Sequence, residues 1–258
     1  SLLSAEKVSN GTFELGSEEI TNGDFATDSD WTFTTGANQS WSISNGTAIS
    51  DGNQSGLAYL NQNGAIINGK TYEATLTVVS RSAGEVRIGV GGSNSSGINQ
   101  TGTFTHILTA GSTQFWIRAS GDFIGSIDNI SVKEVTDWTL GAGWSVANGK
   151  ANANTSGNYK NLTQSNIFEV GKTYTTSFEI TAISQGSVRL SQAGIDVSGF
   201  KSSLGVYTTN YTAISTGSSD QLIMQGFNSF IGTIGNISIK QVTPADNGAI
   251  TNGATWLP

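Results

Sequence analysis

The sequence predicts an all-β fold built from two tandem antiparallel β-sandwich domains. Its composition is the first reason: the 258 residues include 33 glycines and 2 prolines, and only 12% are charged, against ~25% in a typical globular protein. The second reason is the alternation of apolar and polar residues along short segments, which is typical of strands with one buried face. The third reason is a long internal repeat.

The repeat is clearest at the end of each half. Residues 123–135, with the sequence FIGSIDNISVKEV, return as residues 230–242, FIGTIGNISIKQV, and nine of the thirteen positions are identical. Repeats of this length are domains, because solenoid units recur every ~20–50 residues. We therefore expect a first domain over residues 20–135 and a second over residues 136–243.

The first domain is expected to hold about eight short strands and no helix. Its clearest strand spans residues 71–78, where four apolar residues alternate with polar ones. Before it, Asn45-Gly46 predicts a hairpin turn, since both residues tolerate positive φ. The second domain repeats the same order and carries five more residues in the loop between Arg189 and Tyr211. Antiparallel domains tolerate insertions best in such loops.

The two domains differ at their first strand. The phrase Asn22-Gly-Asp-Phe25 introduces the first domain. Only Thr136 and Asp137 separate the closing strand of the first domain from Trp138 of the second, which leaves no room for such a phrase. The second domain therefore lacks a first strand of its own.

The two ends of the chain offer sources for the missing strand. Phrases similar to Asn22-Gly-Asp-Phe25 stand at residues 9–13 and 252–256. The segment 1–19 is expected to be an acidic leader or an extra strand, and the C-terminal extension 244–258 an exchanged strand or a linker. Either segment, from the same chain or from a neighbouring copy, can complete the second sandwich by strand addition.

The distribution of charge excludes some partners. The formal net charge is −7, and the first 30 residues hold seven acidic residues against one lysine. Without a basic cluster we expect no binding to nucleic acid. No apolar run approaches the ~18 residues of a membrane span, so we expect no membrane insertion. The acidic leader is either a segment that attracts cations or a solvated terminus.

These features together resemble a known group of domains. The phrase Asn-Gly-Asp-Phe, a following Trp31, about eight strands and the ending Phe-x-Gly-x-Ile-Asp-Asn-Ile-Ser-Val are similar to the galactose-binding-like β-jelly-roll domains of carbohydrate-binding modules. The ending is also similar to the domain endings of many phage tail-fibre and virion surface proteins. The resemblance covers about residues 20–243.

The resemblance implies a non-enzymatic protein of the virion surface, such as a fibre, an appendage or a capsid decoration, and therefore an extracellular location. Its partners would be other virion proteins or copies of itself, together with a cell-surface glycan. Two alternatives stay open. One is a purely structural assembly or spacer protein without a sugar site, and the other is the binding module of a secreted polysaccharide-degrading enzyme.

The resemblance also implies a structural Ca²⁺ that ties the first strand to the last. The positions that match its ligands are Asn22, Asp24 and Asp128. Ca²⁺ takes six to eight oxygen ligands, so an acidic turn beside a strand carboxylate suits it. Gly235 replaces Asp128 in the second domain, which confines the ion to the first. The alternative is that Asp128 is a surface carboxylate near Lys133.

A sugar site needs exposed aromatic faces with polar side chains beside them. The candidates in the first domain are Trp116, Trp31, Tyr59, Arg87 and Arg118. Trp31 recurs in the second domain as Trp138, so a core role competes with sugar binding there. Trp116 alternates with Phe115 and Ile117 and becomes Ile223 in the repeat, which makes it the best stacking candidate. The alternative for Trp116 is an ordinary tryptophan of an interface or of the second sheet.

Enzyme chemistry has little support in the sequence. His106 is the only histidine and becomes Ala213 in the repeat. Glu73 and Glu85 lie on neighbouring predicted strands and have the residue type of a glycosidase pair, but both change in the second domain. We therefore predict that the chain is not an enzyme.

Overall fold

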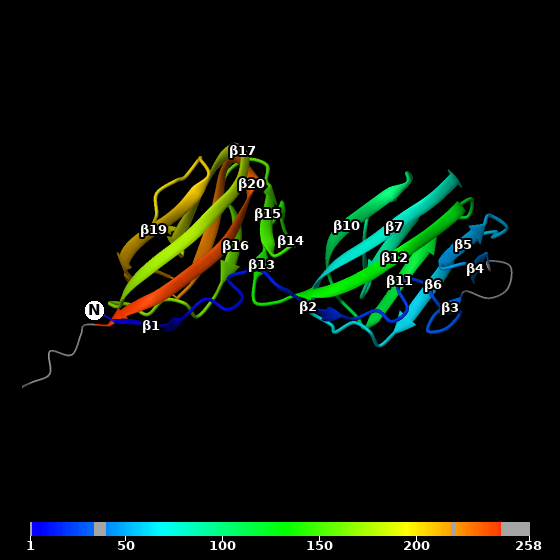
Figure 1. Cartoon of the computed structure of the whole chain (residues 1–258), viewed down its shortest axis with the longest axis horizontal. Coiled ribbons are helices and arrows are strands. Elements are labelled where there is room, and N and C mark those ends of the chain that lie inside the picture. Colours follow the sequence, from blue (N-terminus) through cyan, green and yellow to red (C-terminus); the bar gives the residue numbers. More distant parts are fainter. Residues whose placement is uncertain (1, 34–39, 218–219, 244–258) are drawn as a thin grey trace, which may run out of the picture. The chain divides into compact units, whose positions relative to one another are not determined.

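The computed structural model describes residues 2–33, 40–217 and 220–243. The chain divides into two compact units. The first unit holds residues 14–136 with 145–149, and the second holds residues 1–13, 137–144 and 150–258. The described residues form strands, turns and loops without a helix (Figure 1). The structure is therefore all-β, as predicted, and within the described residues no helix is long and apolar enough to cross a membrane.

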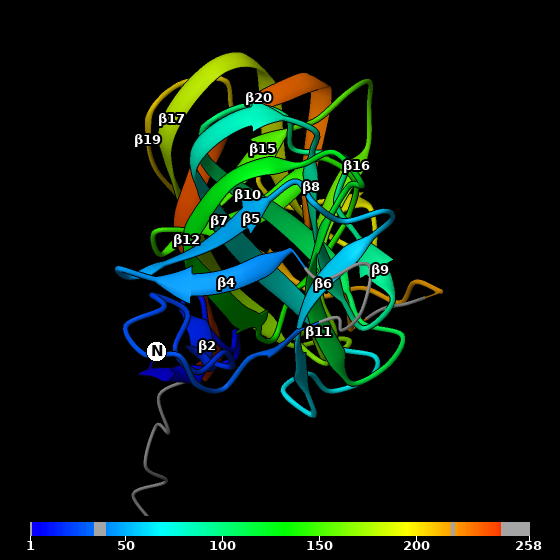
Figure 2. The ribbon, with the colours of Figure 1, turned by 90° about the vertical axis from the view of Figure 1, so that its right-hand side faces the viewer.

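The first unit is an antiparallel β-sandwich. Its six-stranded sheet has the order β10-β7-β12-β5-β4, with β2 added to β12. Its five-stranded sheet has the order β3-β6-β11-β8-β9. Figure 2 shows β12, β7 and β5 of one sheet on the left and β6, β8 and β9 of the other on the right. The strand bounds are Leu15–Glu18 (β2), Thr32–Phe33 (β3), Trp41–Ser44 (β4), Thr47–Asp51 (β5), Ala58–Asn63 (β6), Thr71–Ala83 (β7), Val86–Val90 (β8), Ser93–Asn94 (β9), Gly102–Thr109 (β10), Gln114–Ala119 (β11) and Ile124–Val135 (β12).

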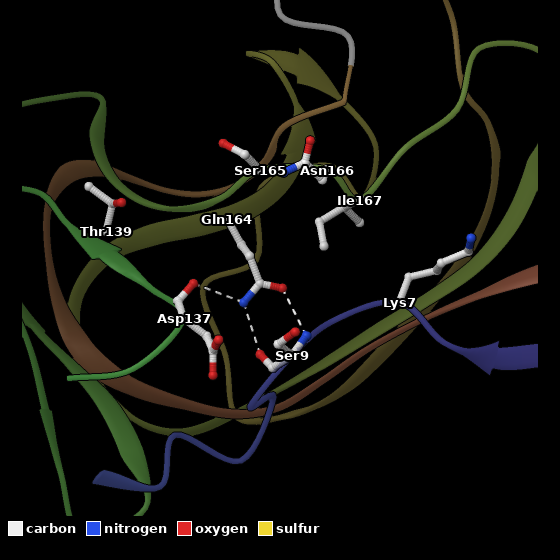
Figure 3. A pocket seen from close by; sticks show the side chains of 8 residues that line it. All are labelled: Lys7, Ser9, Asp137, Thr139, Gln164, Ser165, Asn166 and Ile167. Carbon is white, nitrogen blue, oxygen red and sulfur yellow. Dashed lines mark hydrogen bonds between the residues drawn. The ribbon is translucent and has the colours of Figure 1, made fainter. Parts of the chain in front are cut away.

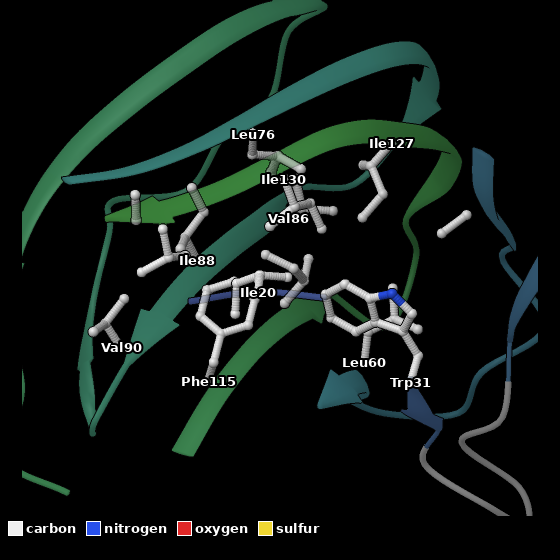
Figure 4. Close-up of a cluster of buried hydrophobic side chains, with 14 of the residues drawn as sticks. Ile20, Trp31, Leu60, Leu76, Val86, Ile88, Val90, Phe115, Ile127 and Ile130 are labelled. Atoms are coloured by element: carbon white, nitrogen blue, oxygen red, sulfur yellow. The ribbon is translucent and has the colours of Figure 1, made fainter. Parts of the chain in front are cut away.

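The core of the first unit lies between these two sheets. Successive strand residues point to opposite faces, so every second residue of a strand reaches the core. The predicted alternation of β7 is confirmed, since Tyr72, Ala74, Leu76 and Val78 are all buried. Figure 4 shows side chains of both sheets meeting around Phe115. The residues labelled there are Ile20, Trp31, Leu60, Leu76, Val86, Ile88, Val90, Phe115, Ile127 and Ile130.

The second unit repeats this arrangement with longer strands. The path β13-β16-β20-β15-β14 is joined by β1, β17, β18 and β19 into nine hydrogen-bonded strands. Its last strand, β14, is paired in this sheet although its residues 145–147 fall in the segment grouped with the first unit. One strand, β17, spans what β7 and β8 form in the first unit, and β20 likewise spans β11 and β12. The strand bounds are Leu2–Glu6 (β1), Thr139–Leu140 (β13), Trp144–Ala147 (β14), Lys150–Asn154 (β15), Lys160–Gln164 (β16), Thr173–Gln192 (β17), Ile195–Asp196 (β18), Gly205–Thr212 (β19) and Leu222–Thr243 (β20).

The missing first strand of the second unit comes from the N-terminus of the same chain. β1 pairs antiparallel with β20, with Leu3 opposite Val242 and Glu6 opposite Lys240. β2 pairs in the same way with β12 of the first unit. Of the sources that the sequence left open, the structure uses the spare N-terminal strand. The phrase at residues 252–256 lies outside the described residues.

Residues 1–19, which the sequence predicts as one acidic leader or extra strand, are divided between the two units and hold two strands, β1 and β2. Residues 1–13 belong to the second unit, and residues from 14 onward belong to the first. The physical reason is a short repeat that the domain boundaries missed: EKVSNGTF at residues 6–13 and EEITNGDF at residues 18–25. Each copy binds the closing strand of a different unit. In chain order, the first unit is inserted between the first strand of the second unit and the rest of it.

Equivalent contacts hold both copies of this short repeat in place. The carboxylate of Glu6 accepts a hydrogen bond from the Ile239 backbone N–H at 2.6 Å, and Glu18 accepts one from Val132 at 2.6 Å. The side chain of each glutamate also accepts a bond from a serine hydroxyl, Ser238 or Ser131. A carboxylate that accepts charge-assisted bonds is a strong clamp. It fixes each first strand against its closing strand.

The Asn-Gly dipeptide of each copy turns the chain toward a core tryptophan. Asn10 and Asn22 have φ of 49° and 51°, a left-handed conformation that asparagine tolerates better than most residues. Their carbonyl oxygens accept the indole N–H of Trp138 at 2.9 Å and of Trp31 at 3.0 Å. The phrase and its tryptophan thus form one packing unit in each sandwich.

Candidate binding site

The five-stranded sheet of the first unit presents a mixed aromatic and basic surface on its outer face. Phe115, Ile117 and Ala119 of β11 are buried, so the alternate residues Trp116 and Arg118 face outward. Arg118 lies opposite Tyr59 on β6 and opposite Arg87 on β8. Trp116 lies opposite Gly89 on β8. We call Tyr59, Arg87, Gly89, Trp116 and Arg118 the Trp116 surface.

The indole of Trp116 covers a glycine. A Cβ atom at Gly89 would lie 2.0 Å from the indole, so only glycine leaves room for the ring there. Tyr59 packs edge-on against Trp116, with ring centroids 5.7 Å apart and an interplanar angle of 81°. The Arg118 guanidinium carbon lies 5.5 Å from the centroid of the Trp116 ring. Tyr59 and Trp116 are both half-buried, so part of each ring stays accessible.

The two arginines of the Trp116 surface differ in their partners. Arg87 forms an ion pair with Glu85 at 2.9 Å. The Glu85 carboxylate is held close to the following loop, since a Cβ at Gly97 would lie 1.8 Å from it. Among the described residues no carboxylate lies within ion-pair distance of Arg118. The surface therefore keeps one positive charge uncompensated.

Trp31 does not belong to this surface, contrary to the prediction. Its side chain is 8% exposed, and its indole N–H is bonded to the Asn22 carbonyl oxygen. The ring packs against Phe25 and Phe115, with centroids 5.2 and 6.2 Å away. The core role that its recurrence as Trp138 favoured is the one it has. Four of the five predicted sugar-site residues thus share one face, and Trp31 does not.

The three predicted calcium ligands are used locally. The Asn22 amide nitrogen donates to the carbonyl oxygens of Thr27 at 2.7 Å and Ser29 at 2.8 Å, and its oxygen accepts the Thr27 N–H. Asp24 accepts a bond from the Ala26 backbone N–H, and Asp128 accepts two from Asn129. Within the described chain no group of three or more His, Cys, Asp or Glu residues is arranged to hold a metal ion. These contacts do not fit a six- to eight-oxygen calcium site, and the ion stays a prediction of the resemblance.

The glutamates considered as a glycosidase pair lie in different sheets. Glu73 is on β7 of the six-stranded sheet, opposite Lys133. Burial raises the pKa of Glu73 above its usual value, while Lys133 opposes the rise. Glu85 comes directly before β8 of the other sheet and is bound to Arg87. Burial lowers the pKa of His106, and its Nε2 has no hydrogen-bond partner among the described residues.

The equivalent sheet face of the second unit is built differently. At the positions of Tyr59, Arg118 and Arg87 it carries Asn161, Gln225 and Arg189. The Gln225 side-chain oxygen accepts a bond from Arg189 Nη2 at 2.7 Å, and its nitrogen donates to Asn161 at 3.2 Å. Arg189 also lies 3.4 Å from Asp196. Hydrogen bonds therefore connect these three side chains, and Asp196 balances the positive charge of Arg189.

An aromatic cluster of the second unit was missed from the sequence. The rings of Tyr159 and Phe227 have centroids 5.4 Å apart, and those of Phe200 and Phe227 are 4.9 Å apart. Tyr159 is 57% exposed and Phe200 is 39% exposed. The signal lay in the differences between the two repeats, because Tyr159 stands where the first unit has Leu57 and Phe227 where it has Ser120.

A polar pocket in the second unit surrounds Gln164 (Figure 3). The Gln164 side-chain oxygen accepts a hydrogen bond from the Ser9 backbone N–H at 2.9 Å. The Gln164 side-chain nitrogen donates to the carbonyl oxygens of Ser9 at 2.9 Å and Asp137 at 3.0 Å. Gln62 makes the matching pair of bonds to Thr21 in the first unit. The Gln164 amide therefore anchors the N-terminal segment, and the pocket is part of the fold.

Comparisons with known proteins give distant structural matches alone. No family model and no curated protein matches the sequence. The tandem CBM22-1–CBM22-2 domains of Xyn10C from Paenibacillus barcinonensis match with 11% identity over 89% of this chain and 99% of that chain, at a TM-score of 0.32. A conserved protein of unknown function, PA5104, from Pseudomonas aeruginosa PAO1 matches with 12% identity over 84% of this chain and 96% of that chain, at a TM-score of 0.19. AerE from Microcystis aeruginosa matches with 10% identity over 76% of this chain and 93% of that chain, at a TM-score of 0.19.

Proposed function

We propose that the chain is a non-enzymatic binding protein whose first unit holds sugar rings on the Trp116 surface. The observation that carries this proposal is the half-buried Trp116 indole, which lies over Gly89, with the Tyr59 ring edge-on to it and the Arg118 guanidinium carbon over the ring, 5.5 Å from its centroid. A surface tryptophan flanked by polar side chains on a regular sheet is a suitable platform for a pyranose ring.

The physical basis is the two-sided character of a sugar. Its C–H face is apolar and stacks on an aromatic ring, while its hydroxyl groups need hydrogen-bond partners at the edge. Covering ~100 Å² of apolar surface contributes ~2–3 kcal/mol. The Arg118 guanidinium supplies donors for the hydroxyl groups. One platform alone is weak, so a monosaccharide is expected to bind with a Kd of ~1 mM or higher, and a longer chain more tightly.

Where the protein acts follows from the resemblance alone. It suggests the surface of a virion, as a fibre, an appendage or a capsid decoration with other virion proteins or further copies as partners. The binding module of a secreted polysaccharide-degrading enzyme is the alternative location for the same surface. Both locations are extracellular, and both use sugar binding.

A glycan array with the whole chain tests the proposal. The informative variant is Trp116→Ile, because isoleucine is what the second unit carries at the equivalent position, Ile223. We expect the variant to fold and to lose at least ~10-fold in affinity, the worth of ~1.4 kcal/mol, for every sugar that the wild type binds. The matched control is Tyr159→Ala in the second unit, which should bind as the wild type does. A wild-type protein that binds no sugar would instead favour the structural spacer.

A further inference from the structure

We infer that the Trp116 surface is built for an anionic sugar, one that carries a carboxylate or a sulfate group, and that Arg118 binds the anion. This inference rests on the proposed function and narrows its ligand. The observation behind it is a pair of like charges, Arg87 and Arg118, placed opposite each other beside an aromatic platform.

Arg118 and Arg87 are direct cross-strand partners of β11 and β8. Side chains at such positions share one face of the sheet with Cβ atoms ~4.5–5.5 Å apart, and like charges there are destabilising. Glu85 compensates Arg87 alone. Within the part of the chain that the structure describes, the Arg118 guanidinium interacts with the Trp116 ring and with no carboxylate. An anion bound between the two guanidinium groups would remove the repulsion.

The second unit shows that the fold does not require two arginines at these positions. There the pair is Arg189 and Gln225, joined by hydrogen bonds of 2.7 and 3.0 Å. Its positive charge is further balanced by Asp196. A glutamine at the position of Arg118 is therefore compatible with the sheet, because its side chain forms hydrogen bonds with the arginine opposite. The first unit instead carries Arg118 at this position. Arg118 faces a like charge, which is destabilising, and it lies next to the aromatic platform.

The arginine pair of the Trp116 surface stands out because the rest of the first unit is acidic. Residues 14–136 hold 12 acidic residues against 5 Lys and Arg, a balance of −7. Two of these five bases face each other on the Trp116 surface. Attraction of an anion must then come from this row, since the unit as a whole repels anions. The Debye length is ~10 Å at 0.1 M salt, so at that ionic strength the repulsion from distant acids is largely screened while the contact at Arg118 is kept.

The chemistry of arginine fits the two anions named. Its planar guanidinium presents donors that match the oxygens of a carboxylate or a sulfate in a bidentate manner. The guanidinium carbon of Arg118 lies 5.5 Å from the Trp116 ring centroid. A sugar ring that stacks on the indole thus has its charged substituent within reach of Arg118.

Two matched pairs of polymers test the inference on the whole chain. Polygalacturonate is compared with its methyl ester, and dextran sulfate with dextran, by affinity electrophoresis and calorimetry at 0.1 M salt. We expect at least one anionic polymer to bind at least ~10-fold more tightly than its neutral counterpart. The pair that shows the preference identifies carboxylate or sulfate as the recognised group.

Arg118→Gln, which copies the second unit, should abolish that preference, and it should weaken binding of the neutral polymer much less than binding of the anionic one, because glutamine still offers a hydrogen-bond donor. Arg81→Gln is the matched control, because Arg81 is an exposed arginine of the same unit outside the Trp116 surface, and it should keep the preference. Equal binding of charged and neutral polymers overturns the inference and leaves the proposed function standing. A preference that survives Arg118→Gln, or that Arg81→Gln also removes, overturns it as well. Binding that Trp116→Ile leaves unchanged overturns the proposed function itself.

Discussion

At the scale of single residues, Trp31 and Trp116 show how one residue type serves two purposes in the same sandwich. Trp31 fills the core and closes its hydrogen bond on the backbone of the first-strand phrase. Trp116 covers a glycine on the opposite side of the five-stranded sheet and keeps part of its ring accessible. The distinction was partly present in the sequence, because Trp31 recurs in the second unit and Trp116 does not.

Alanine at each tryptophan separates these roles. Trp31→Ala should lower the free energy of unfolding by ~3–5 kcal/mol, the usual cost of removing a large core aromatic residue. Trp116→Ala should lower it by ~1 kcal/mol or less, as is usual for surface substitutions, and act on sugar binding instead. Chemical denaturation followed by tryptophan fluorescence measures both. Equal losses of stability would show that Trp116 is a core residue.

Glu73 gives the first unit a pH-dependent stability. Burial raises the pKa of this carboxyl group in the folded state, and its Oε2 has no hydrogen-bond partner among the described residues. The folded protein therefore holds this proton at a pH where the unfolded chain has lost it. Stability is expected to fall as the pH rises through the folded pKa. Glu73→Gln should be more stable than the wild type at pH 7 and should lose this advantage near pH 4. An advantage that does not change with pH would contradict the assignment.

At the scale of elements, the turn that follows each first strand is packed tightly against the closing strand of the same unit. A Cβ at Gly11 would lie 2.0 Å from the Ile237 carbonyl oxygen, and one at Gly23 would lie 2.0 Å from that of Ile130. The amide of each isoleucine donates to the carbonyl of the same glycine, at 3.0 and 2.8 Å. The backbone of each turn thus approaches the backbone of the closing strand closely, which glycine alone permits.

Gly11→Ala should therefore destabilise the second unit and Gly23→Ala the first, each by ~2 kcal/mol or more, because the clash is with backbone atoms. Gly217→Ala is the control, since nothing lies within 4 Å of a Cβ there. Urea denaturation of the three variants measures the effect. If Gly11→Ala melts like the control, the N-terminal segment does not pack on β20.

The resemblance implies a calcium ion that ties the first strand of the first unit to its closing strand. The hydrogen bonds that the structure shows for the three matching side chains all go to neighbouring residues in local turns. The three residues are Asn22, Asp24 and Asp128. At Gly235, the counterpart of Asp128, a Cβ would lie 2.8 Å from the Lys150 ammonium nitrogen. We expect the melting temperature to be the same in excess calcium and in EDTA. A rise with calcium that Asp128→Asn abolishes would establish the site that the resemblance implies.

The sequence predicted the elements better than their connections. The alternation along residues 71–78 and the Asn-Gly turns place strands reliably, because burial on one face imposes a period of two. The absence of a first strand before Trp138 was also visible. The sequence limited the source of that strand to the two ends of the chain but did not decide between them, since pairing between β1 and β20 joins residues more than 230 positions apart and no local pattern encodes such a distance. Likewise, the grouping of Tyr59, Arg87 and Arg118 with Trp116 depends on the register of three strands.

At the scale of the whole molecule, the chain order makes one domain an insertion in the other. The second unit begins at the N-terminus, is interrupted by the first unit and resumes at Asp137. The repeat EKVSNGTF and EEITNGDF thus supplies one first strand for each sandwich, although the two copies are adjacent in sequence. Among the described residues, the strand that completes the second unit is β1, which precedes the first unit.

Removal of residues 1–13 tests this account most directly, with hydrogen exchange followed by mass spectrometry. We expect the backbone amides of β20 around Ile237 and Ile239, which bond to Gly11 and Glu6, to lose their protection in the truncated chain. The amides of β12 in the first unit should keep theirs, and a peptide of residues 1–13 added in excess should restore the protection of β20. Unchanged protection of β20 in the truncated chain would contradict the claim that the N-terminal segment completes the second sandwich.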